Sequence, residues 1–376
     1  MFTFVIANFE IIMTTKEYSN YKQEKISGRY ITLKNIEPLL KDIASFFEVT
    51  ELGKSFLQKH IYKVKIGTGK KRILIWSQMH GNETTGTKAI FDLFNFFKAP
   101  KTQKRLRDQI LETCTLIVIP ILNPDGAKKF TRVNAQEIDL NRDAVDLKAP
   151  ESILLNTLLH DFKPHYCFNL HDQRPIFSVG VESNPATISF LAPSINEERT
   201  VTDKRKETMQ VIVAMKKMLE KHIPNQIGRY TDEFYPTATG DNFQKAGFNT
   251  ILIEAGHYNG DYSREKTREY NFLALLSGIK EISMPKKYNY ESYFKIPNNE
   301  KKYFDSIYEN VILKGKKNKI GVFLKIILFN ESIKFIPAYK ILNNSDRFSA
   351  DTIFSKELEF TNIEEFKSYV SIKKME

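Results

Sequence analysis

The sequence is poor in cysteine and has no long uninterrupted apolar run. Only two cysteines occur in 376 residues, Cys114 and Cys167, and both lie in apolar stretches where a thiol packs as a small hydrophobic group. A disulfide scaffold is therefore excluded. No run reaches the roughly 18 apolar residues that a membrane span needs, so we expect no membrane partner. Internal repeats and low-complexity tracts are also absent from the sequence.

The first residues lack the features of a secretory leader. Residues 1–13 are apolar in patches, but they contain Glu10 and have neither a basic start nor a small-residue cleavage signal. Translation from Met13 is an alternative start. Together with the missing membrane span, these features predict a cytoplasmic protein.

Positive charge is abundant but is not gathered into one segment. The formal net charge is +11, which could indicate an anionic partner. The lysines are spread along the whole chain, however, and no RNA- or DNA-binding signature is present. We therefore expect no nucleic-acid partner, and a non-enzymatic protein that binds an anionic polymer is only a remote alternative.

Apolar strand-like runs alternate with amphipathic stretches over most of the chain. This alternation predicts an α/β fold with a mixed central sheet flanked by helices on both faces. The expected strands are His60–Ile66, Ile73–Trp76, Thr115–Leu122, Tyr166–Leu170 and Thr250–Ile253, and the expected helices are Ile36–Phe47, Thr84–Phe97, Lys101–Leu111, Glu151–Asp161, Glu197–His222 and Arg264–Ile282. Two local features are also predicted, a hairpin that joins the first two strands and a turn at Asn123-Pro124-Asp125-Gly126.

The chain is long enough for one large domain and a smaller one. We expect a loose N-terminal lead-in at 1–30, a large domain at 31–285 and a small β-rich C-terminal appendage at 286–376. The last boundary follows the break at Met284-Pro285, and a hairpin around Asn330-Glu331 is expected beyond it. No sequence feature indicates the oligomeric state.

A histidine and a glutamate follow the apolar run Ile73–Trp76. In an α/β sheet, ligands bind beyond the carboxyl ends of the strands, where His80 and Glu83 would lie. Imidazole and carboxylate groups are zinc ligands, and a catalytic zinc site uses three of them. Alone, this pair also fits a capping histidine and a solvated glutamate.

Two more predicted strands end in residues that could serve as a third ligand and a general base. His171 follows the strand Tyr166–Leu170 and would complete the ligand set, although alone it also fits a core histidine. Glu254 follows Thr250–Ile253, where a buried carboxylate is costly without a function or a salt bridge. Arg132 and Arg142 lie in a loop expected over the same edge, where a guanidinium could grip a carboxylate.

These residues resemble the zinc carboxypeptidases of the carboxypeptidase A type. The resemblance extends over roughly residues 60–280 and rests on an ordered series: His80-x-x-Glu83, Asn123-Pro124-Asp125-Gly126, Arg132, Asn141-Arg142 within Asp139-Leu140-Asn141-Arg142-Asp143, His171, Tyr235 and Glu254.

The resemblance implies a role for each of these residues. His80, Glu83 and His171 would ligate one zinc ion. Glu254 would be the general base and Arg132 would stabilise the developing oxyanion. The substrate's free C-terminal carboxylate would be bound by Asn141 and Arg142, and Tyr235 would close over it, with Tyr230 as the alternative.

The sequence departs from the family pattern after the third ligand. Asp172-Gln173-Arg174 stands where digestive members have small and aromatic residues, and the added charge at Arg174 could help to bind an acidic or unusual substrate. Gly240, at the floor of the family's side-chain pocket, offers no charge. His257, just past Glu254, could support the ligands from behind, but we interpret it as an ordinary loop residue.

The leading hypothesis is a zinc-dependent carboxypeptidase that acts on peptides or peptide-like conjugates with a free C-terminal carboxylate. The same fold and metal set could instead hydrolyse N-acyl amino acids or cell-wall peptides. Asn123-Pro124-Asp125-Gly126 and Asn141-Arg142 favour peptides.

Overall fold

A sheet of eight strands forms the centre of the molecule. The computed structural model describes residues 13–99, 102–286, 288–343 and 347–373, and the expectations about the first twelve residues lie outside these ranges. In spatial order the strands are β1 (Glu48–Lys54), β2 (His60–Ile66), β4 (Cys114–Ile119), β3 (Lys71–Ser77), β5 (Tyr166–Asp172), β10 (Asn249–Ala255), β8 (Ile188–Leu191) and β9 (Ile227–Arg229). The sheet is mixed, because parallel and antiparallel pairs both occur in it.

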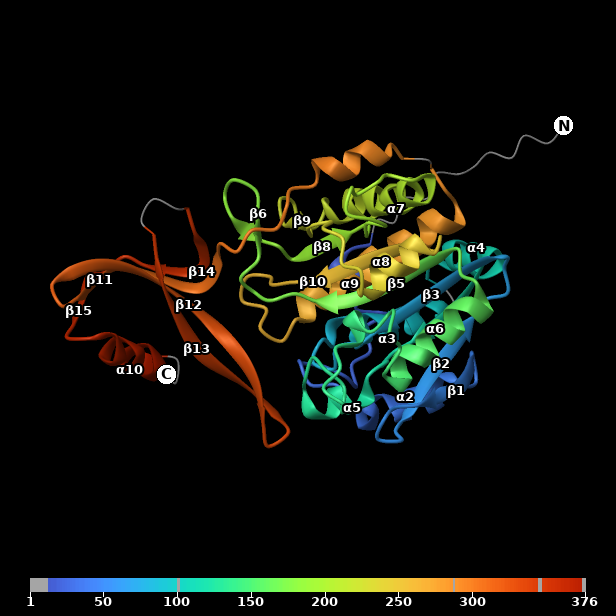
Figure 1. The fold of residues 1–376 in the computed structure, drawn as a ribbon, viewed down its shortest axis with the longest axis horizontal. Coiled ribbons are helices and arrows are strands. Elements are labelled where there is room, and N and C mark those ends of the chain that lie inside the picture. Colours follow the sequence, from blue (N-terminus) through green and yellow to red (C-terminus); the bar gives the residue numbers. More distant parts are fainter. Residues whose placement is uncertain (1–12, 100–101, 287, 344–346, 374–376) are drawn as a thin grey trace.

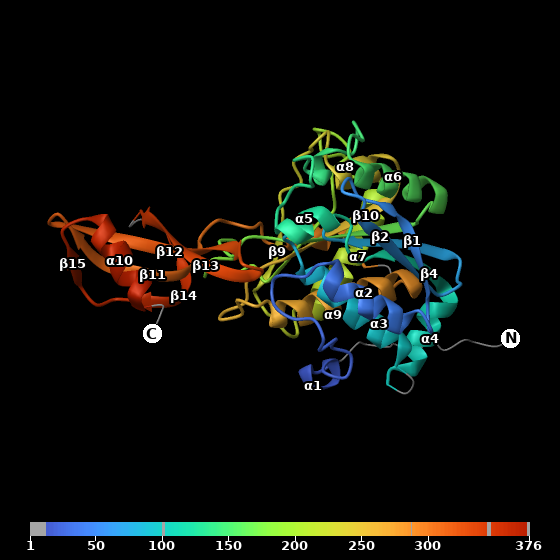
Figure 2. The same cartoon turned by 90° about the horizontal axis from the view of Figure 1, so that it is seen from below.

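Helices cover both faces of this sheet, as Figures 1 and 2 show. They are α1 (Thr15–Tyr18), α2 (Leu33–Ile43), α3 (Thr85–Lys98), α4 (Lys104–Thr113), α5 (Pro124–Lys129), α6 (Pro150–Phe162), α7 (Asp203–Leu219), α8 (Thr239–Lys245) and α9 (Glu265–Ser283), with the short 3-10 turns η1 (Leu140–Arg142) and η2 (Tyr290–Lys295).

Alternate residues of each strand supply the two cores. On β3, Ile73 and Ile75 belong to the core that also contains residues of α2, α3, α7 and α9, whereas Leu74 and Trp76 belong to the core that contains residues of α6 and α8. All four side chains are fully buried, as expected for a strand that is covered on both faces. The predicted fold class is confirmed.

Three neighbouring parallel strands have the same direction and end at one edge. Ser77 of β3 pairs with Leu170 of β5, and Glu254 of β10 pairs with His171 of β5. Residues that follow these strands are therefore brought together although they are far apart in sequence.

Two local predictions are wrong. β2 and β3 do not form a hairpin, because β4 lies between them and pairs with both. The segment Asn123–Gly126 is not a turn but the start of α5, in which Asn123 caps the helix by accepting from the Gly126 N–H at 2.8 Å and Pro124 occupies the first position. An asparagine cap followed by proline is as favourable at a helix start as in a turn.

The predicted helix at Glu197–His222 begins later than expected, at Asp203. Thr202 accepts a hydrogen bond from the Arg205 N–H at its N-terminus, which is the usual role of an N-cap threonine. The short elements β8, β9 and α8 were not predicted, because each is too short to show a periodic pattern.

Residues 14–30 are not loose, in contrast to the expected lead-in. Tyr18, Tyr21 and Ile26 are buried, and Tyr18 donates from its hydroxyl to Asp92 on α3 at 2.7 Å. Asp92 is fully buried and forms two hydrogen bonds with Arg268 of α9, at 2.6 and 2.7 Å. This buried pair joins the N-terminal segment to two helices.

A second sheet forms the C-terminal appendage, which stands apart from the helical layers in Figure 1. It contains β11 (Tyr303–Leu313), β12 (Lys316–Phe329), β13 (Ser332–Leu342), β14 (Ser349–Phe354) and β15 (Leu358–Phe360), and α10 (Ile363–Lys373) packs on it. The hairpin around Asn330-Glu331 is confirmed. Before this sheet, Tyr293 and Ile296 still pack in the large core. The proposed domain boundaries stay a prediction.

Within the described ranges, none of the helices combines the length and apolar character that crossing a membrane requires.

Replacing Asp92 by alanine should destabilise the fold strongly. The change removes both Asp92 hydrogen bonds from the buried Arg268 guanidinium and leaves the partly exposed Glu265 as its carboxylate partner. Removing one partner of a buried ion pair costs roughly 3–5 kcal/mol. Urea unfolding measures the loss. Asp42→Ala is the matched control, because its ion pair with Lys25 is exposed and is worth about 0–1 kcal/mol. Equal losses for both variants would contradict the assigned role of the buried pair.

Candidate active site

Three candidate ligands meet at the carboxyl edge of the central sheet. His80 and Glu83 lie in the loop between β3 and α3, and His171 is the next-to-last residue of β5. The two histidines are almost completely buried, and Glu83 is 9% exposed. One ligand atom from each of the three side chains lies within 4.8 Å of the others.

The donor atoms of this cluster fit a tetrahedral metal ion. The two Nδ1 atoms of His80 and His171 are 3.1 Å apart, close to the separation of about 3.3 Å that tetrahedral ligands at zinc distances would have. Glu83 directs one carboxylate oxygen to each ring, at 2.9 Å and 2.8 Å. Two imidazole lone pairs that converge on one point repel each other unless a cation or proton lies between them. The residues present therefore fit a zinc ion.

Asp139 orients the first ligand from behind. Its Oδ1 lies 3.0 Å from Nε2 of His80, so the ring can donate to the carboxylate and present Nδ1 to the centre of the cluster. The same carboxylate accepts from Arg132 Nε at 2.9 Å and from the Asn141 N–H. The sequence alone does not reveal this role, although Asp139 stands directly before Leu140-Asn141-Arg142.

The charges of the cluster are compensated within it. Although burial opposes it, the two histidines lower the pKa of Glu83 well below its usual value. Arg132 is half exposed, and its Nη1 lies 3.6 Å from a Glu83 oxygen. A guanidinium therefore stands at the solvent side of the cluster.

The ligand loop is held by side chains that the sequence did not mark as functional. Gln78 adopts a left-handed backbone conformation, with φ of 45°, and its buried amide bonds to Ile31, Gly81 and Thr87. Such a conformation is uncommon for a residue other than glycine. These hydrogen bonds fix the direction in which the chain leaves β3.

The same loop packs directly against the start of α5. A Cβ atom on Gly81 would lie 1.9 Å from the Gly126 carbonyl carbon, so only glycine allows this approach. Asn123 caps α5 and also donates to the Met79 carbonyl at 3.2 Å. The segment Asn123–Gly126 thus has a structural role beside the ligands.

Glu254 lies beside the third ligand on the neighbouring strand. It pairs in register with His171 across β5 and β10. Burial, followed by the charges of Glu83 and Asp172, raises the pKa of its carboxyl group well above the usual value. A carboxylate with a raised pKa is suited to accept a proton near neutral pH.

The candidate carboxylate-binding residues gather between η1 and α8. Asn141 accepts through its side-chain oxygen from the Thr239 N–H at 3.2 Å, which ties η1 to α8. Arg142 is exposed, and its guanidinium lies 5.1 Å from the ring centre of Tyr235. Tyr235 is 43% exposed, and its ring is therefore accessible beside a cation.

Tyr230 has a different environment from Tyr235. It packs on Phe177, with ring centres 5.3 Å apart. Burial and the negative charges of Glu254 and Glu83 raise its pKa, which the charge of Arg174 opposes. Tyr230 is thus the tyrosine near the carboxylates, and Arg174 is exposed at the same side.

The residue after the third ligand does not face a substrate. Asp172 accepts from the hydroxyl of Thr85 at 2.8 Å and lies 3.4 Å from the buried guanidinium of Arg264. The next residue, Gln173, is also buried and bonds to Ser189 and Asn299. Of the three residues Asp172–Arg174, the exposed one is Arg174.

His257 is not an ordinary loop residue, so that prediction is wrong. It is 3% exposed, and its Nε2 lies 2.9 Å from both carboxylate oxygens of Asp351 on β14. The partner is 94 residues further along the chain, and the sequence carries no signal that would pair the two.

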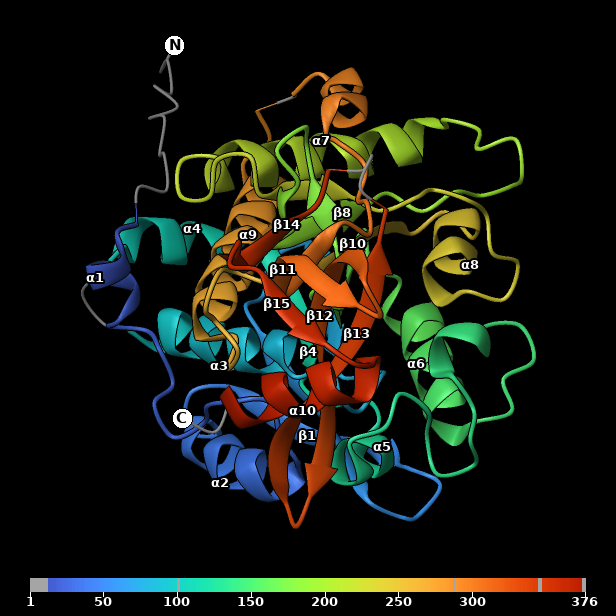
Figure 3. The ribbon, with the colours of Figure 1, turned by 90° about the vertical axis from the view of Figure 1, so that its left-hand side faces the viewer.

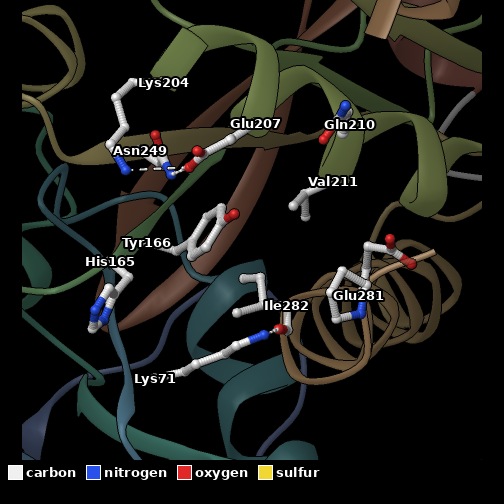
Figure 4. Close-up of a pocket in the computed structure, with 11 residues that line it drawn as sticks. Lys71, His165, Tyr166, Lys204, Glu207, Gln210, Val211, Asn249, Glu281 and Ile282 are labelled. Atoms are coloured by element: carbon white, nitrogen blue, oxygen red, sulfur yellow. Dashed lines mark hydrogen bonds and ion pairs between the residues drawn. The ribbon is translucent and has the colours of Figure 1, made fainter. Parts of the chain in front are cut away.

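A cavity of about 260 Å³ lies at the opposite edge of the same strands (Figure 4). Lys71, Tyr166 and Asn249, the first residues of β3, β5 and β10, contribute to its lining. Lys71 donates to the Ile282 carbonyl and Asn249 to Glu207, so these polar groups pair within the protein. The candidate chemistry is therefore at the other end of the sheet.

Comparison with known proteins gives relatives of one kind. Residues 33–180 match the family described as zinc carboxypeptidase. Carboxypeptidase 2 of Trichophyton tonsurans is 29% identical over 108 residues, which are 29% of this chain and 20% of the relative. Carboxypeptidase SOL1 of Arabidopsis thaliana is 26% identical over 167 residues, 39% of this chain and 34% of the relative. The chain thus spans about a fifth to a third of the length of these relatives.

Solved structures show the same fold. A metallo-carboxypeptidase from Burkholderia cenocepacia has a TM-score of 0.53 at 18% identity, covering 66% of this chain and 68% of its own. Carboxypeptidase A from Helicoverpa armigera also has a TM-score of 0.53, at 15% identity, covering 69% and 75%. The matched family region, residues 33–180, contains His80, Glu83 and His171, so the three clustered side chains lie in the part of the chain that is similar to zinc carboxypeptidases.

Proposed function

We propose that the protein is a zinc-dependent carboxypeptidase that removes C-terminal amino acids from peptides or peptide-like conjugates. The observation that carries this proposal is the convergence of His80, Glu83 and His171, with Glu254 in register beside His171. Three ligands and an adjacent base are the set that metal-assisted hydrolysis needs.

Zinc, when bound by the three ligands, supplies a Lewis acid that polarises the scissile carbonyl. Glu254 takes a proton from the attacking water and returns it to the leaving amine, a task that its raised pKa supports. Arg132 stands at the solvent side of Glu83 and can stabilise the negative charge that develops on the carbonyl oxygen.

Specificity for the end of a chain requires a partner for the terminal carboxylate. Asn141 and Arg142 provide an amide and an exposed guanidinium on one turn, and a guanidinium can bind a carboxylate through two hydrogen bonds. Tyr235 lies over Arg142 and can cover the bound carboxylate. Arg174, the exposed cation that follows His171, is available to bind an acidic group of the substrate.

Metal analysis of the purified protein should find about one zinc per chain. His171→Ala should abolish stoichiometric binding, because two protein ligands do not retain zinc as three do. Inductively coupled plasma mass spectrometry after dialysis measures the content. His160→Ala is the control, since His160 is exposed on α6 and lies outside the cluster. A wild-type protein that takes up no metal, or His171→Ala that keeps it, would overturn the site.

Glu254→Gln should lower kcat by at least about 10²-fold, because the amide cannot accept the proton. Zinc content should stay at the wild-type value, since Glu254 is not among the three clustered ligands. Steady-state kinetics and metal analysis on the same preparation test both parts. Wild-type turnover by the variant would remove Glu254 from the mechanism.

The substrate class can be tested with three related compounds. We expect cleavage of a blocked dipeptide with a free C-terminal carboxylate, and little cleavage of the same dipeptide as its C-terminal amide. The reason is that Arg142 and Asn141 would lose the anion that they bind. The third compound is an N-acetyl amino acid, and its preferential hydrolysis would favour the alternative function of an N-acyl amino acid deacylase. Chromatographic detection of the released amino acid measures all three rates.

A further inference from the structure

The C-terminal sheet extends into a two-stranded ribbon. β12 pairs with β11 only as far as Val322, whereas its pairing with β13 continues to Phe329. Residues 323–329 and 332–338 therefore form a ribbon of two strands. An isolated ribbon of this kind is only marginally stable in water, so it needs support from other parts of the molecule.

One face of this ribbon is apolar. Ile326 pairs with Phe335 and Leu328 pairs with Ile333, and directly paired residues lie on the same face of a sheet. We call these four residues the inner face. The outer face carries Ile327, Phe329 and Ile336 together with Lys325, Lys334 and Ser332. Only the inner face is entirely apolar.

The inner face is not part of a hydrophobic core. Phe335 is 38% exposed, and the other three side chains are half-buried. None of the four belongs to the apolar clusters that the described residues form. The fold therefore covers this continuous apolar surface only in part, and such surfaces often mark binding sites.

A buried carboxylate fixes the appendage to the catalytic domain. Asp351 is 7% exposed in its side chain and bonds to His257. It also accepts from the Tyr303 hydroxyl at 2.8 Å, and from the Gly260 N–H and the Tyr262 hydroxyl at 3.2 Å each. His257 lies three residues after Glu254, so the junction is next to the proposed base. The position of the ribbon is therefore defined relative to the active site.

The ribbon crosses the edge of the sheet at which the ligands lie. Halfway along the ribbon, the Phe335 ring packs edge-on against Tyr262, with centres 5.7 Å apart. At its tip, Glu331 pairs with Lys128 of α5. Tyr262 follows Glu254 and Lys128 precedes Arg132, so the ribbon reaches across the region between the proposed base and Arg132. Figure 3 shows the hairpin in front of this edge with its tip beside α5, while α8 lies to the side.

This placement decides which part of a substrate could meet the ribbon. The terminal carboxylate is assigned to Asn141 and Arg142, between η1 and α8. The peptide upstream of the cleaved bond must leave the metal cluster in another direction, because the carboxylate end occupies that side. The appendage contacts the segments after β5 and β10, at Ser178 and His257. It therefore lies on a different side of the metal cluster from η1 and α8.

We propose that the inner face of the ribbon, formed by Ile326, Leu328, Ile333 and Phe335, is an exosite for apolar side chains of the peptide upstream of the cleaved bond. This inference rests on the proposed carboxypeptidase function and adds a substrate class, which is peptides with apolar residues before the C-terminal pair. Contact with the substrate buries the surface that the fold itself leaves half exposed. A dipeptide is too short to reach it.

The test compares a short and two long substrates. One is a blocked dipeptide, and the others are blocked hexapeptides with the same last two residues and either four apolar or four small polar residues upstream. The wild-type kcat/KM should be about tenfold higher for the apolar hexapeptide than for the dipeptide, the order of selectivity that a few apolar contacts provide. The polar hexapeptide should resemble the dipeptide.

Matched double variants of the ribbon assign the effect to one face. I326T together with I333T should bring the ratio of apolar hexapeptide to dipeptide close to one and leave the dipeptide rate unchanged. I327T together with I336T likewise removes two isoleucines, but from the outer face, and should keep the wild-type ratio. Thermal unfolding of all three proteins verifies that the ribbon variants are folded.

The outcomes separate the exosite from the catalytic function. The exosite is contradicted if the inner-face variant keeps the wild-type ratio of kcat/KM for the apolar hexapeptide to that for the dipeptide, or if both variants lose this ratio equally. Cleavage of the dipeptide would still support the proposed carboxypeptidase function. If the wild-type protein cleaves the dipeptide and the apolar hexapeptide equally, the exosite is likewise excluded. If no peptide is turned over, both the proposed carboxypeptidase function and the exosite are contradicted.

Discussion

The active site depends on the parallel pairing of β3, β5 and β10. Because these strands share one direction, the loop after β3, the end of β5 and the end of β10 meet at a single edge. A shift of β10 against β5 by one residue would turn Glu254 to the opposite face of the sheet. Burial on both faces fixes the register, since each strand residue has a place in one of two cores. The proposed metal ligation and proton transfer would thus rely on ordinary hydrophobic packing.

The sequence predicted this arrangement well because its signals are local. Continuous apolar runs mark the buried strands, and polar residues directly after them mark the edge at which a ligand would bind. His80, Glu83, His171 and Glu254 follow this rule, and the structure brings the first three together. Helix positions were also close to those observed, since Thr84–Phe97, Glu151–Asp161 and Arg264–Ile282 were predicted where α3, α6 and α9 lie.

What the sequence did not predict depends on contacts between distant segments. The strand that separates β2 from β3 comes from residues 114–119, and no local pattern shows that it inserts there. Asp139 stands in the same position as any polar loop residue until His80 is placed beside it. The role of His257 likewise shows only in the structure, where its Nε2 lies 2.9 Å from the Asp351 carboxylate. Such roles are properties of pairs, whereas propensity and periodicity describe single segments.

The appendage gives the active site a boundary that the strand edge alone would lack. At its junction with the large domain, the buried Asp351 carboxylate accepts hydrogen bonds from four residues, which are His257, Gly260, Tyr262 and Tyr303. Breaking this network would leave buried polar groups unpaired, which costs free energy of folding. The loop after Glu254 is therefore stiffened from the outside, while Arg264 holds the ends of β5 and β10 from the inside by bonding to the carbonyls of Gln173 and Ala255. Since the loop that carries this junction begins directly after β10, a short hydrogen-bonded segment connects the appendage to Glu254.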